Sequence, residues 1–288
     1  MAHFPIDPDY LEWYIKAGLA EDVGPGDYTS MACIPADRQS QARLLCKDKG
    51  VLAGVKVAER IFSHVDPLMR MEVFIRDGEE VGNGDIAFEV TASTRALLMA
   101  ERLVLNTMQR LSGIATMSRA YASFVSDLPV KILDTRKTTP LLRPLEKWAV
   151  HTGGCVNYRY GLFDWFMIKD NHVEASGGIR EAIQAVSDYK VAHRLNLPLT
   201  VEVRTMDELQ EAMEVGGFQR VMLDNFDVRE MADAVAYIDG KCEVEASGGI
   251  TLESLRSVAE TGVDFISTGA LTHSSKSLDL SLKIIKSS

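Results

Sequence analysis

In residues 199–225, LTVEVRTMDELQEAMEVGGFQRVMLDN, two short apolar runs flank a longer segment with a helical pattern. The runs LTVEV at 199–203 and VMLDN at 221–225 have the length and the apolar content of buried strands. A strand, a helix and a second strand in this order indicate a parallel βαβ unit. The stretch therefore places the chain in the α/β class.

The same alternation of strand and helix continues on both sides of this stretch. Further apolar runs that lead into polar residues occur at 130–134, 166–170, 242–247 and 265–269. Six runs, or seven if 153–158 contributes a strand, predict an open α/β barrel of the TIM type with about seven strands. A Rossmann sheet is the alternative, but no GxGxxG segment follows the first strand.

The first third of the chain predicts a separate unit of helices and strands. Asp7 followed by Pro8 is typical of a helix N-cap and a first helical residue. A long helix is expected at about 94–111, and Gly113 is expected to break it before a second helix. Strands are expected at 42–46, 51–53, 71–75 and 86–90.

Composition and charge exclude several classes of protein. The 288 residues are 46% hydrophobic and 25% charged, which is ordinary for a globular protein. A net charge of −10 argues against a general nucleic-acid binder, and no apolar run approaches the ~20 residues of a membrane span. Residues 1–5 lack the pattern of a signal peptide. The scattered Cys33, Cys46, Cys155 and Cys242 indicate a reducing cytoplasm, and no His or Cys spacing suggests structural zinc.

Parallel barrels carry their active sites at the carboxyl ends of the strands. Arg136, Arg159 and Lys169 lie at or just beyond such ends, so they converge if the barrel is correct. Arginine binds carboxylates through a bidentate fork, and lysine adds a compact charge. The three cations therefore predict an anion site. The alternative is that each is a surface residue or a salt-bridge partner.

Two carboxylates lie near the ends of other strands. Glu202 and Asp224 follow apolar residues, and a carboxylate in a buried strand needs a partner. Mg²⁺, which takes one or two protein carboxylates plus phosphate oxygens, or a substrate hydroxyl would provide one. A structural ion pair inside the barrel is the alternative.

Glycine loops follow the last two predicted strands. Ser247-Gly248-Gly249 leads into a helix, and Thr268-Gly269-Ala270 follows the next run. Backbone N–H groups at a helix start bind phosphate, and the last loops of such barrels often do so. The earlier copy at 176–178 follows no strand and indicates a turn. No proton transfer is assigned to His172 or His273, because a lone histidine is usually structural.

These segments also carry a family resemblance. The chain resembles the quinolinate phosphoribosyltransferases (nicotinate-nucleotide pyrophosphorylases, carboxylating) from about residue 10 to its end. DTRKT at 134–138 together with IKDNH at 168–172 is highly specific. Other matching segments are EDVGPGD at 21–27, ER at 101–102, QRLSGIA at 109–115, KWAV at 147–150, VEV at 201–203, LDN at 223–225 and EASGGI at 245–250.

The resemblance implies an architecture and an assembly. An N-terminal α/β sandwich over 1–112, completed by 274–288, would join an open seven-stranded barrel over 113–273. The enzyme would be a cytoplasmic homodimer with shared active sites, with a hexamer as the alternative. Its partners would be quinolinate and phosphoribosyl pyrophosphate, with no nucleic acid and no membrane.

The resemblance also implies a reaction and its residues. The phosphoribosyl group would pass to quinolinate with loss of CO₂ and pyrophosphate, giving nicotinate mononucleotide for NAD biosynthesis. Lys137 would face the pyrophosphate, while Glu202 and Asp224 would hold the ribose hydroxyls and Mg²⁺. Arg102 would reach the neighbouring subunit's site. Further substrate contacts would come from Thr135, Arg136, Tyr158, Arg159, Lys169, Ser247, Gly248, Gly249, Thr268, Gly269, Ala270 and His273.

Two positions depart from the family pattern. Tyr158 replaces a histidine, and Leu141 replaces a small residue. Tyrosine is neutral at pH 7, so the change is a tolerated variant, a cause of weaker quinolinate binding, or the mark of another heteroaromatic acceptor. A Schiff-base aldolase using Lys169 is a rival from another reaction class. A non-catalytic binder of a phosphate ligand is a third hypothesis.

Overall fold

A computed structural model describes residues 6–287, so the expectation about a signal peptide falls on residues outside the described part. The chain forms two compact units. Unit 1 contains the residues up to Arg119, then Thr139–Gly154 and the segment from Ser274 onward. Unit 2 contains Ala120–Thr138 and Cys155–His273. Within residues 6–287, no helix combines the length and hydropathy that a bilayer span requires.

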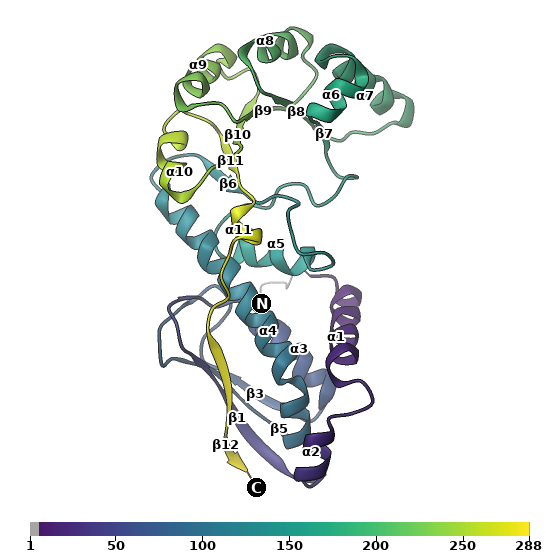
Figure 1. Ribbon diagram of the computed structural model, residues 1–288, viewed down its shortest axis with the longest axis vertical. Coiled ribbons are helices and arrows are strands. Elements are labelled where there is room, and N and C mark those ends of the chain that lie inside the picture. Colours follow the sequence, from purple (N-terminus) through teal and green to yellow (C-terminus); the bar gives the residue numbers. More distant parts are fainter. Residues whose placement is uncertain (1–5, 288) are drawn as a thin grey trace. The chain divides into compact units, whose positions relative to one another are not determined.

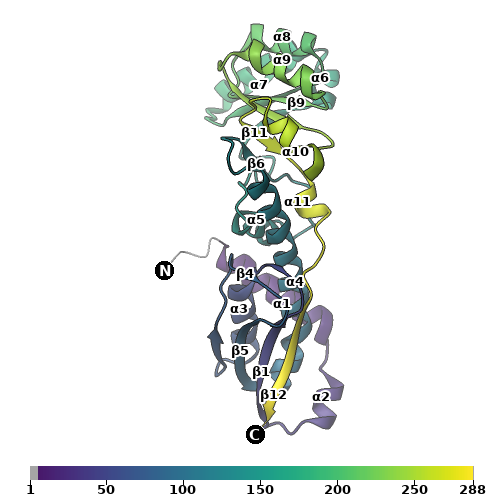
Figure 2. The same cartoon turned by 90° about the vertical axis from the view of Figure 1, so that its left-hand side faces the viewer.

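Unit 1 is built on an antiparallel sheet with the strand order β12-β1-β5-β3. Alternate residues of β1 are buried, including Ala42 and Leu44, so one face of the sheet contributes to a core. Figure 1 shows helices α3 and α4 beside this sheet, and Figure 2 shows β12 running along β1. The strands are β1 (Gln39–Cys46), β3 (Arg70–Val73), β5 (Ile86–Ser93) and β12 (Leu280–Ser287), with the short pair β2 (Gly50–Val51) and β4 (Glu80–Val81). The helices are α1 (Pro8–Val23), α2 (Tyr28–Cys33), α3 (Val55–Val65), α4 (Thr94–Phe124, shared with unit 2) and α5 (Arg143–Thr152).

The helix signals of the first third were correct in one place and wrong in another. Asp7 caps α1, and its Oδ1 accepts a hydrogen bond from the N–H of Asp9 at 2.9 Å. Gly113, however, does not break α4, which continues from Thr94 to Phe124. A Cβ at Gly113 would lie 2.0 Å from the carbonyl oxygen of Lys276. The glycine is therefore explained by a close backbone approach and not by a helix end.

Unit 2 is an open α/β barrel. Its parallel sheet has the strand order β6-β11-β10-β9-β8-β7, and Figure 1 shows helices α6 to α10 along its outer side. The segment at 153–158 adds a seventh element through an isolated parallel bridge between Leu133 and Val156. The predicted fold class is thus confirmed. The strands are β6 (Lys131–Leu133), β7 (Phe166–Ile168), β8 (Leu199–Val203), β9 (Arg220–Asp224), β10 (Glu243–Ser247) and β11 (Phe265–Ser267). The helices are α6 (Asp170–Ser176), α7 (Ile179–His193), α8 (Met206–Val215), α9 (Val228–Ile238), α10 (Leu252–Ala259) and α11 (Ala270–His273).

The interior of the barrel is polar in part. Thr200, Glu202, Arg220 and Glu245 are all buried, although each belongs to a central strand. Contacts between strands that are not neighbours identify the interior face, because the Arg220 guanidinium on β9 lies 3.8 Å from the Phe265 ring centroid on β11. Alternate residues of these strands therefore form a polar column inside unit 2.

Candidate active site

The strand register brings the predicted site residues of unit 2 to one edge of the sheet. Ser247 pairs with Asp224, Ser267 with Leu133, and Ile168 with Val201. The strands are parallel, so the residues at and after their carboxyl ends lie together. The edge carries Asp134, Thr135, Arg136, Lys137, Lys169, Glu202, Asp224, Ser247, Gly248, Gly249, Thr268, Gly269, Ala270 and His273.

Glu202 and Asp224 form the acidic side of this edge. The Lys169 ammonium makes an ion pair with Glu202, whose side chain is only 5% exposed. Burial raises the pKa of Asp224, and the nearby charge of Glu202 raises it further. Asn225 Nδ2 donates a hydrogen bond to Asp224 Oδ2 at 2.8 Å. The ion-pair alternative thus describes Glu202, while the carboxyl group of Asp224 forms no ion pair among the described residues and would be stabilised in its charged form by a bound cation or hydroxyl.

Arg136 and Arg159 form the basic side. Burial lowers the pKa of Arg159, and the charge of Arg136 lowers it further, so the two guanidinium groups lie close together. Among the residues described, neither forms an ion pair with a carboxylate. Within 6–287, Arg136 Nε is buried and has no hydrogen-bond partner. A pair of like charges with an unused buried donor is suited to an anion.

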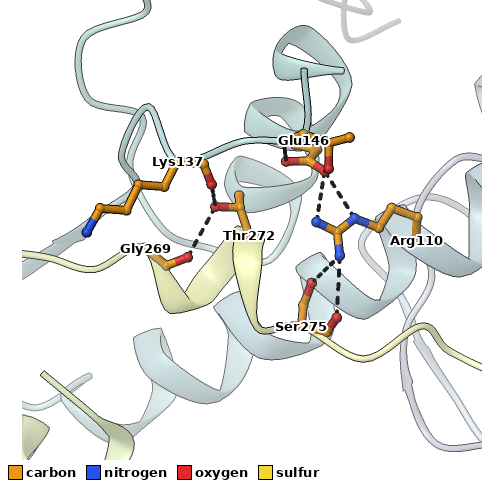
Figure 3. A network of polar contacts seen from close by, with 7 residues as sticks. Arg110, Lys137, Glu146, Gly269, Thr272 and Ser275 are labelled. Carbon is orange, nitrogen blue, oxygen red and sulfur yellow. Dashed lines mark hydrogen bonds and ion pairs between the residues drawn. The ribbon is translucent and has the colours of Figure 1, made fainter. Parts of the chain in front are cut away.

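Lys137 is held over the loop that follows β11. The hydroxyl of Thr272 donates to the Lys137 carbonyl at 2.8 Å and contacts the Gly269 carbonyl at 3.2 Å (Figure 3). A Cβ at Gly269 would lie 2.8 Å from Lys137 Cδ and 2.7 Å from His273 Cδ2. Gly269 therefore leaves the space through which the lysine stem passes. The Lys137 N–H donates to Thr135 Oγ1 at 3.0 Å, which shapes the same turn.

The loop after β10 is folded back on the end of β9. The N–H of Asn225 donates to the Ser247 carbonyl at 2.9 Å. Gly248 has φ +96°, and a Cβ there would lie 2.3 Å from Asn225 Oδ1. Only glycine meets both conditions. Thr251 caps α10 directly after the loop, so backbone N–H groups of a helix start adjoin Gly249.

Arg102 lies apart from this set in the chain, on α4 of unit 1. Its side chain is 55% exposed, and its Nη2 lies 3.3 Å from Glu101 Oε1. Unit 1 also contains the pair Arg110 and Glu146, which joins the guanidinium to a fully buried carboxylate at 2.9 Å (Figure 3).

Comparison with known proteins gives the family. The family model of the quinolinate phosphoribosyl transferase C-terminal domain matches residues 114–283, and that of the N-terminal domain matches 27–112. This chain belongs to the quinolinate phosphoribosyltransferase family. Nicotinate-nucleotide pyrophosphorylase (carboxylating), chloroplastic, of Arabidopsis thaliana is 46% identical over 97% of this chain and 84% of that protein. Quinolinate phosphoribosyltransferase (decarboxylating) 1b of Nicotiana tabacum is 45% identical over the same shares.

Solved structures of the family agree with the fold. NadC from Streptococcus pyogenes superimposes with a TM-score of 0.91 at 36% identity, covering 99% of this chain and 100% of that one. The nicotinate-nucleotide pyrophosphorylase from Francisella tularensis gives 0.91 at 35% identity over 97% and 98%. The family resemblance drawn from the DTRKT and IKDNH segments is thus confirmed.

Tyr158, the departure from the family pattern, is a structured part of the barrel. Its N–H donates to Asp134 Oδ1 at 2.8 Å, and its hydroxyl lies 2.7 Å from Thr200 Oγ1. Burial and the charge of Glu245 raise its pKa, so the hydroxyl keeps its proton. The position therefore offers a neutral hydrogen-bonding group beside Arg159.

The Schiff-base rival is disfavoured by the surroundings of Lys169. An aldolase lysine must be a neutral amine to attack a carbonyl. Here the Lys169 side chain is instead paired with the carboxylate of Glu202.

Sequence reasoning missed a group of residues inside the barrel. Arg220 and Trp165 contact Tyr158, and Thr200 hydrogen-bonds to both rings. Arg220 stands at the beginning of its strand, where a charged residue usually faces solvent. The alternation of side chains along a strand could have identified it, because Arg220 lies an even number of residues from Asp224 and so shares the inward face of β9 with it.

Proposed function

We propose that this chain transfers the phosphoribosyl group of phosphoribosyl pyrophosphate to quinolinate, releasing pyrophosphate and CO₂ and giving nicotinate mononucleotide. The observation that carries the proposal is the opposition of charges at one barrel edge. Among residues 6–287, Arg136 and Arg159 form no ion pair with a carboxylate, whereas Glu202 and Asp224 place two carboxylates at the ends of β8 and β9. A dicarboxylate acceptor is complementary to the two arginines, and the ribose hydroxyls of the donor, together with a bound cation, are complementary to the two carboxylates.

On the acceptor side, Arg136 and Arg159 would each bind a carboxylate of quinolinate through their guanidinium forks. Lys169 would add a third positive charge from the end of β7. Tyr158 would stand beside Arg159 in the chain, with its hydroxyl directed at Thr200. Binding the dicarboxylate would also relieve the repulsion between the two arginines.

On the donor side, the loops at 247–249 and 268–270 would hold phosphate with their backbone N–H groups. Lys137 would lie against the pyrophosphate, because its exposed side chain extends over Gly269. Thr135 and His273 would complete the contacts around this turn.

Glu202 and Asp224 fit a magnesium ion, since carboxylate oxygens are its preferred protein ligands. Burial and then the charge of Glu202 raise the pKa of Asp224, and a cation bound there would oppose both effects. In the part of the chain that the structure describes, no three acidic, histidine or cysteine side chains converge. Such a site suits an ion held by one or two carboxylates and by phosphate oxygens. Mg²⁺ bound there would neutralise charge on the leaving pyrophosphate.

The reaction then needs orientation and charge more than covalent catalysis. The bond between the ribose anomeric carbon and the pyrophosphate oxygen breaks as the pyridine nitrogen bonds to that carbon. Lys137 stabilises the departing oxygen, and Glu202 and Asp224 stabilise the positive charge on the ribose. The adjacent carboxylate of the pyridinium then leaves as CO₂, its bonding electrons pass to the ring carbon, and a solvent proton replaces it.

We also propose a homodimer in which Arg102 acts in the partner's site, with a hexamer as the alternative assembly. Arg102 supports this because it is an exposed arginine of unit 1 in a segment that matches the family. Cytoplasmic location is a further proposal, supported by four free cysteines. Fractionation of the native cell would test it, since the Arabidopsis relative is named chloroplastic.

The reaction is tested by product analysis. Purified protein is incubated with Mg²⁺, phosphoribosyl pyrophosphate and either quinolinate or nicotinate, and products are identified by mass spectrometry. Nicotinate mononucleotide is expected from quinolinate alone. A folded sample that forms no product from quinolinate, but does so from another heteroaromatic acid, would replace the proposed acceptor.

A further inference from the structure

A charged side chain is enclosed inside the barrel below the strand ends. The Arg220 side chain is 6% exposed. Its Nε and Nη2 donate to Glu243 Oε2 at 3.0 and 2.8 Å, and its Nη1 donates to Glu245 Oε2 at 3.2 Å. A buried ion pair contributes little net stability compared with apolar packing, because its desolvation is costly. The arrangement therefore calls for a role other than stability.

The guanidinium is also a platform for aromatic rings. It lies 3.8 Å from the centroid of Phe265, 5.0 Å from that of Tyr158 and 5.3 Å from that of Trp165. Contacts of this kind between arginine and ring faces are directional as well as favourable. Arg220 thus restrains three rings at once.

Thr200 restrains the polar ends of two of these rings. Its fully buried Oγ1 lies 2.7 Å from the Tyr158 hydroxyl and accepts from Trp165 Nε1 at 2.9 Å. The two rings also meet edge to face, with centroids 5.5 Å apart. Arg220 and Thr200 therefore fix Tyr158 and Trp165 from two directions.

The fixed rings lead directly to the acceptor side. Arg159 follows Tyr158 in the chain, and its Nη1 donates to the Trp165 carbonyl at 3.3 Å. A shift of Tyr158 or Trp165 would consequently move the guanidinium of Arg159. The geometry points to Arg220 and Thr200 as positioning residues that hold Tyr158 and Trp165 and thereby orient Arg159 toward an acceptor carboxylate. This inference rests on the proposed function.

The matched variants Thr200→Val and Thr200→Ser test it. Valine keeps the shape and removes the hydroxyl, whereas serine keeps the hydroxyl. We expect Thr200→Val to raise the KM for quinolinate by about tenfold or more, because the hydrogen bonds to both Tyr158 and Trp165 are lost together. Thr200→Ser should stay within about twofold of wild type, and the KM for phosphoribosyl pyrophosphate should change little in either.

Arg220→Met extends the test, with Arg256→Met as its control. Arg256 also pairs with two carboxylates of unit 2, Asp127 and Glu260, but it lies on α10. Arg220→Met should raise the quinolinate KM by at least as much as Thr200→Val, while Arg256→Met leaves it within about twofold. If Arg220→Met does not fold, the two Thr200 variants decide.

Two kinetic results would overturn the inference. One is a quinolinate KM near wild type in folded Thr200→Val. The other is an equal rise in the KM of both substrates, since a general structural defect would act on both.

A readout without turnover separates this inference from the proposed reaction. Protein labelled with 5-fluorotryptophan gives ¹⁹F resonances for Trp13, Trp148 and Trp165, and Trp165→Phe assigns the last. Both Thr200→Val and Arg220→Met should shift the Trp165 resonance. Wild-type protein that does not convert quinolinate would refute the proposed reaction. A shift of the Trp165 resonance in the two variants would still support the positioning role. An unshifted Trp165 resonance in both variants would refute the positioning role itself.

Discussion

Lys137 is the residue for which position and chemistry are most directly connected. It is exposed, and Thr272 and Gly269 hold its turn beneath the stem. We expect Lys137→Ala to bind quinolinate normally and to lose about 10²–10³-fold in kcat, because only the leaving group's charge is affected. Calorimetric binding and steady-state kinetics measure the two effects. Lys131→Ala, an exposed lysine on β6, is the control. Wild-type turnover in Lys137→Ala would remove this residue from the mechanism.

Glu245 predicts a pH effect on stability. Burial raises its pKa above the ordinary 4.5, and nearby Ser267 and Arg220 only partly oppose this. The folded state therefore keeps the proton at pH values where the unfolded state has already lost it. The free energy of unfolding should thus fall as the pH rises from about 4.5 through the folded-state value.

Urea titrations of wild type and Glu245→Gln between pH 4 and pH 7 measure this effect. Glutamine cannot ionise, so the stability of wild type relative to the variant should decline with rising pH. Parallel curves for the two proteins would mean that Glu245 does not titrate differently on folding.

For individual residues, the sequence was sufficient to identify those at the strand ends but not those deeper inside the barrel. Lys169, Glu202 and Asp224 were found because apolar runs lead into or surround them. Thr200 lies in the same strand as Glu202, yet nothing in its neighbours reveals that its hydroxyl meets two aromatic rings. Such partners come from other strands, so local patterns do not report them.

Among the elements, α3 depends on a cap from a distant residue. Its N-cap residue, Gly54, has no side chain that could accept a hydrogen bond from the first helical turn. Asp77 accepts instead from the N–H groups of Gly54 and Val55 at 2.7 and 2.8 Å, and from that of Lys56 at 3.2 Å. We expect Asp77→Ala to lower the free energy of unfolding by about 1–3 kcal/mol, because it leaves helix donors unsatisfied. Asp7→Ala at the exposed cap of α1 should cost less, and urea unfolding compares them.

Gly113 gives an opposite outcome to that expected from helix propensity. Alanine normally stabilises a helix relative to glycine by about 1 kcal/mol. In α4 the added methyl group would instead collide with the Lys276 carbonyl, so Gly113→Ala should destabilise by about 1–3 kcal/mol. The control is Gly82→Ala, where the nearest atom to a new Cβ is 3.6 Å away. Increased thermal stability of Gly113→Ala would show that the C-terminal segment does not press on α4.

Elements with a strong local pattern were predicted well. The barrel strands lie within one or two residues of their apolar runs, as for the run at 199–203, which matches β8 (Leu199–Val203). The predicted helix break at Gly113 was wrong because a glycine in a sequence can indicate either a helix end or a close approach of another backbone segment. The close approach involves Lys276, which is distant in the chain, so the residues around Gly113 do not reveal it.

For the whole molecule, the proposed shared site has a quantitative test. Arg102→Ala and Arg159→Ala should each abolish most activity, because each removes a charge from an anion site. A hybrid dimer of the two would keep one intact site if Arg102 serves the partner. Random mixing makes about half of the dimers hybrids, and each hybrid has one intact site of two. About a quarter of the wild-type activity should therefore return.

Coexpression with two affinity tags isolates the hybrids for this assay. Two copies of Arg159→Ala, purified with the same tags, are the control and should stay inactive. Pure hybrids without activity would show that Arg102 does not complete a neighbour's site.

The alternation of strands and helices was enough to predict the barrel, because it is repeated locally along the chain. Which segments of the chain make up unit 1 was harder to predict. Its contacts join residues far apart in the sequence, as Arg110 joins Glu146 and β1 joins β12. Such contacts leave no periodic trace.

The pairing of β12 with β1 has a consequence for how the protein is made. During synthesis the ribosome releases β1 early, whereas its neighbour on one side follows only after every barrel strand. Until then, that edge of β1 has unpaired N–H and C=O groups that could pair with another chain. Nascent chains of this protein should therefore depend on chaperones that shield such an edge. Incomplete chains that lack β12 should aggregate more than chains from which β12 has emerged.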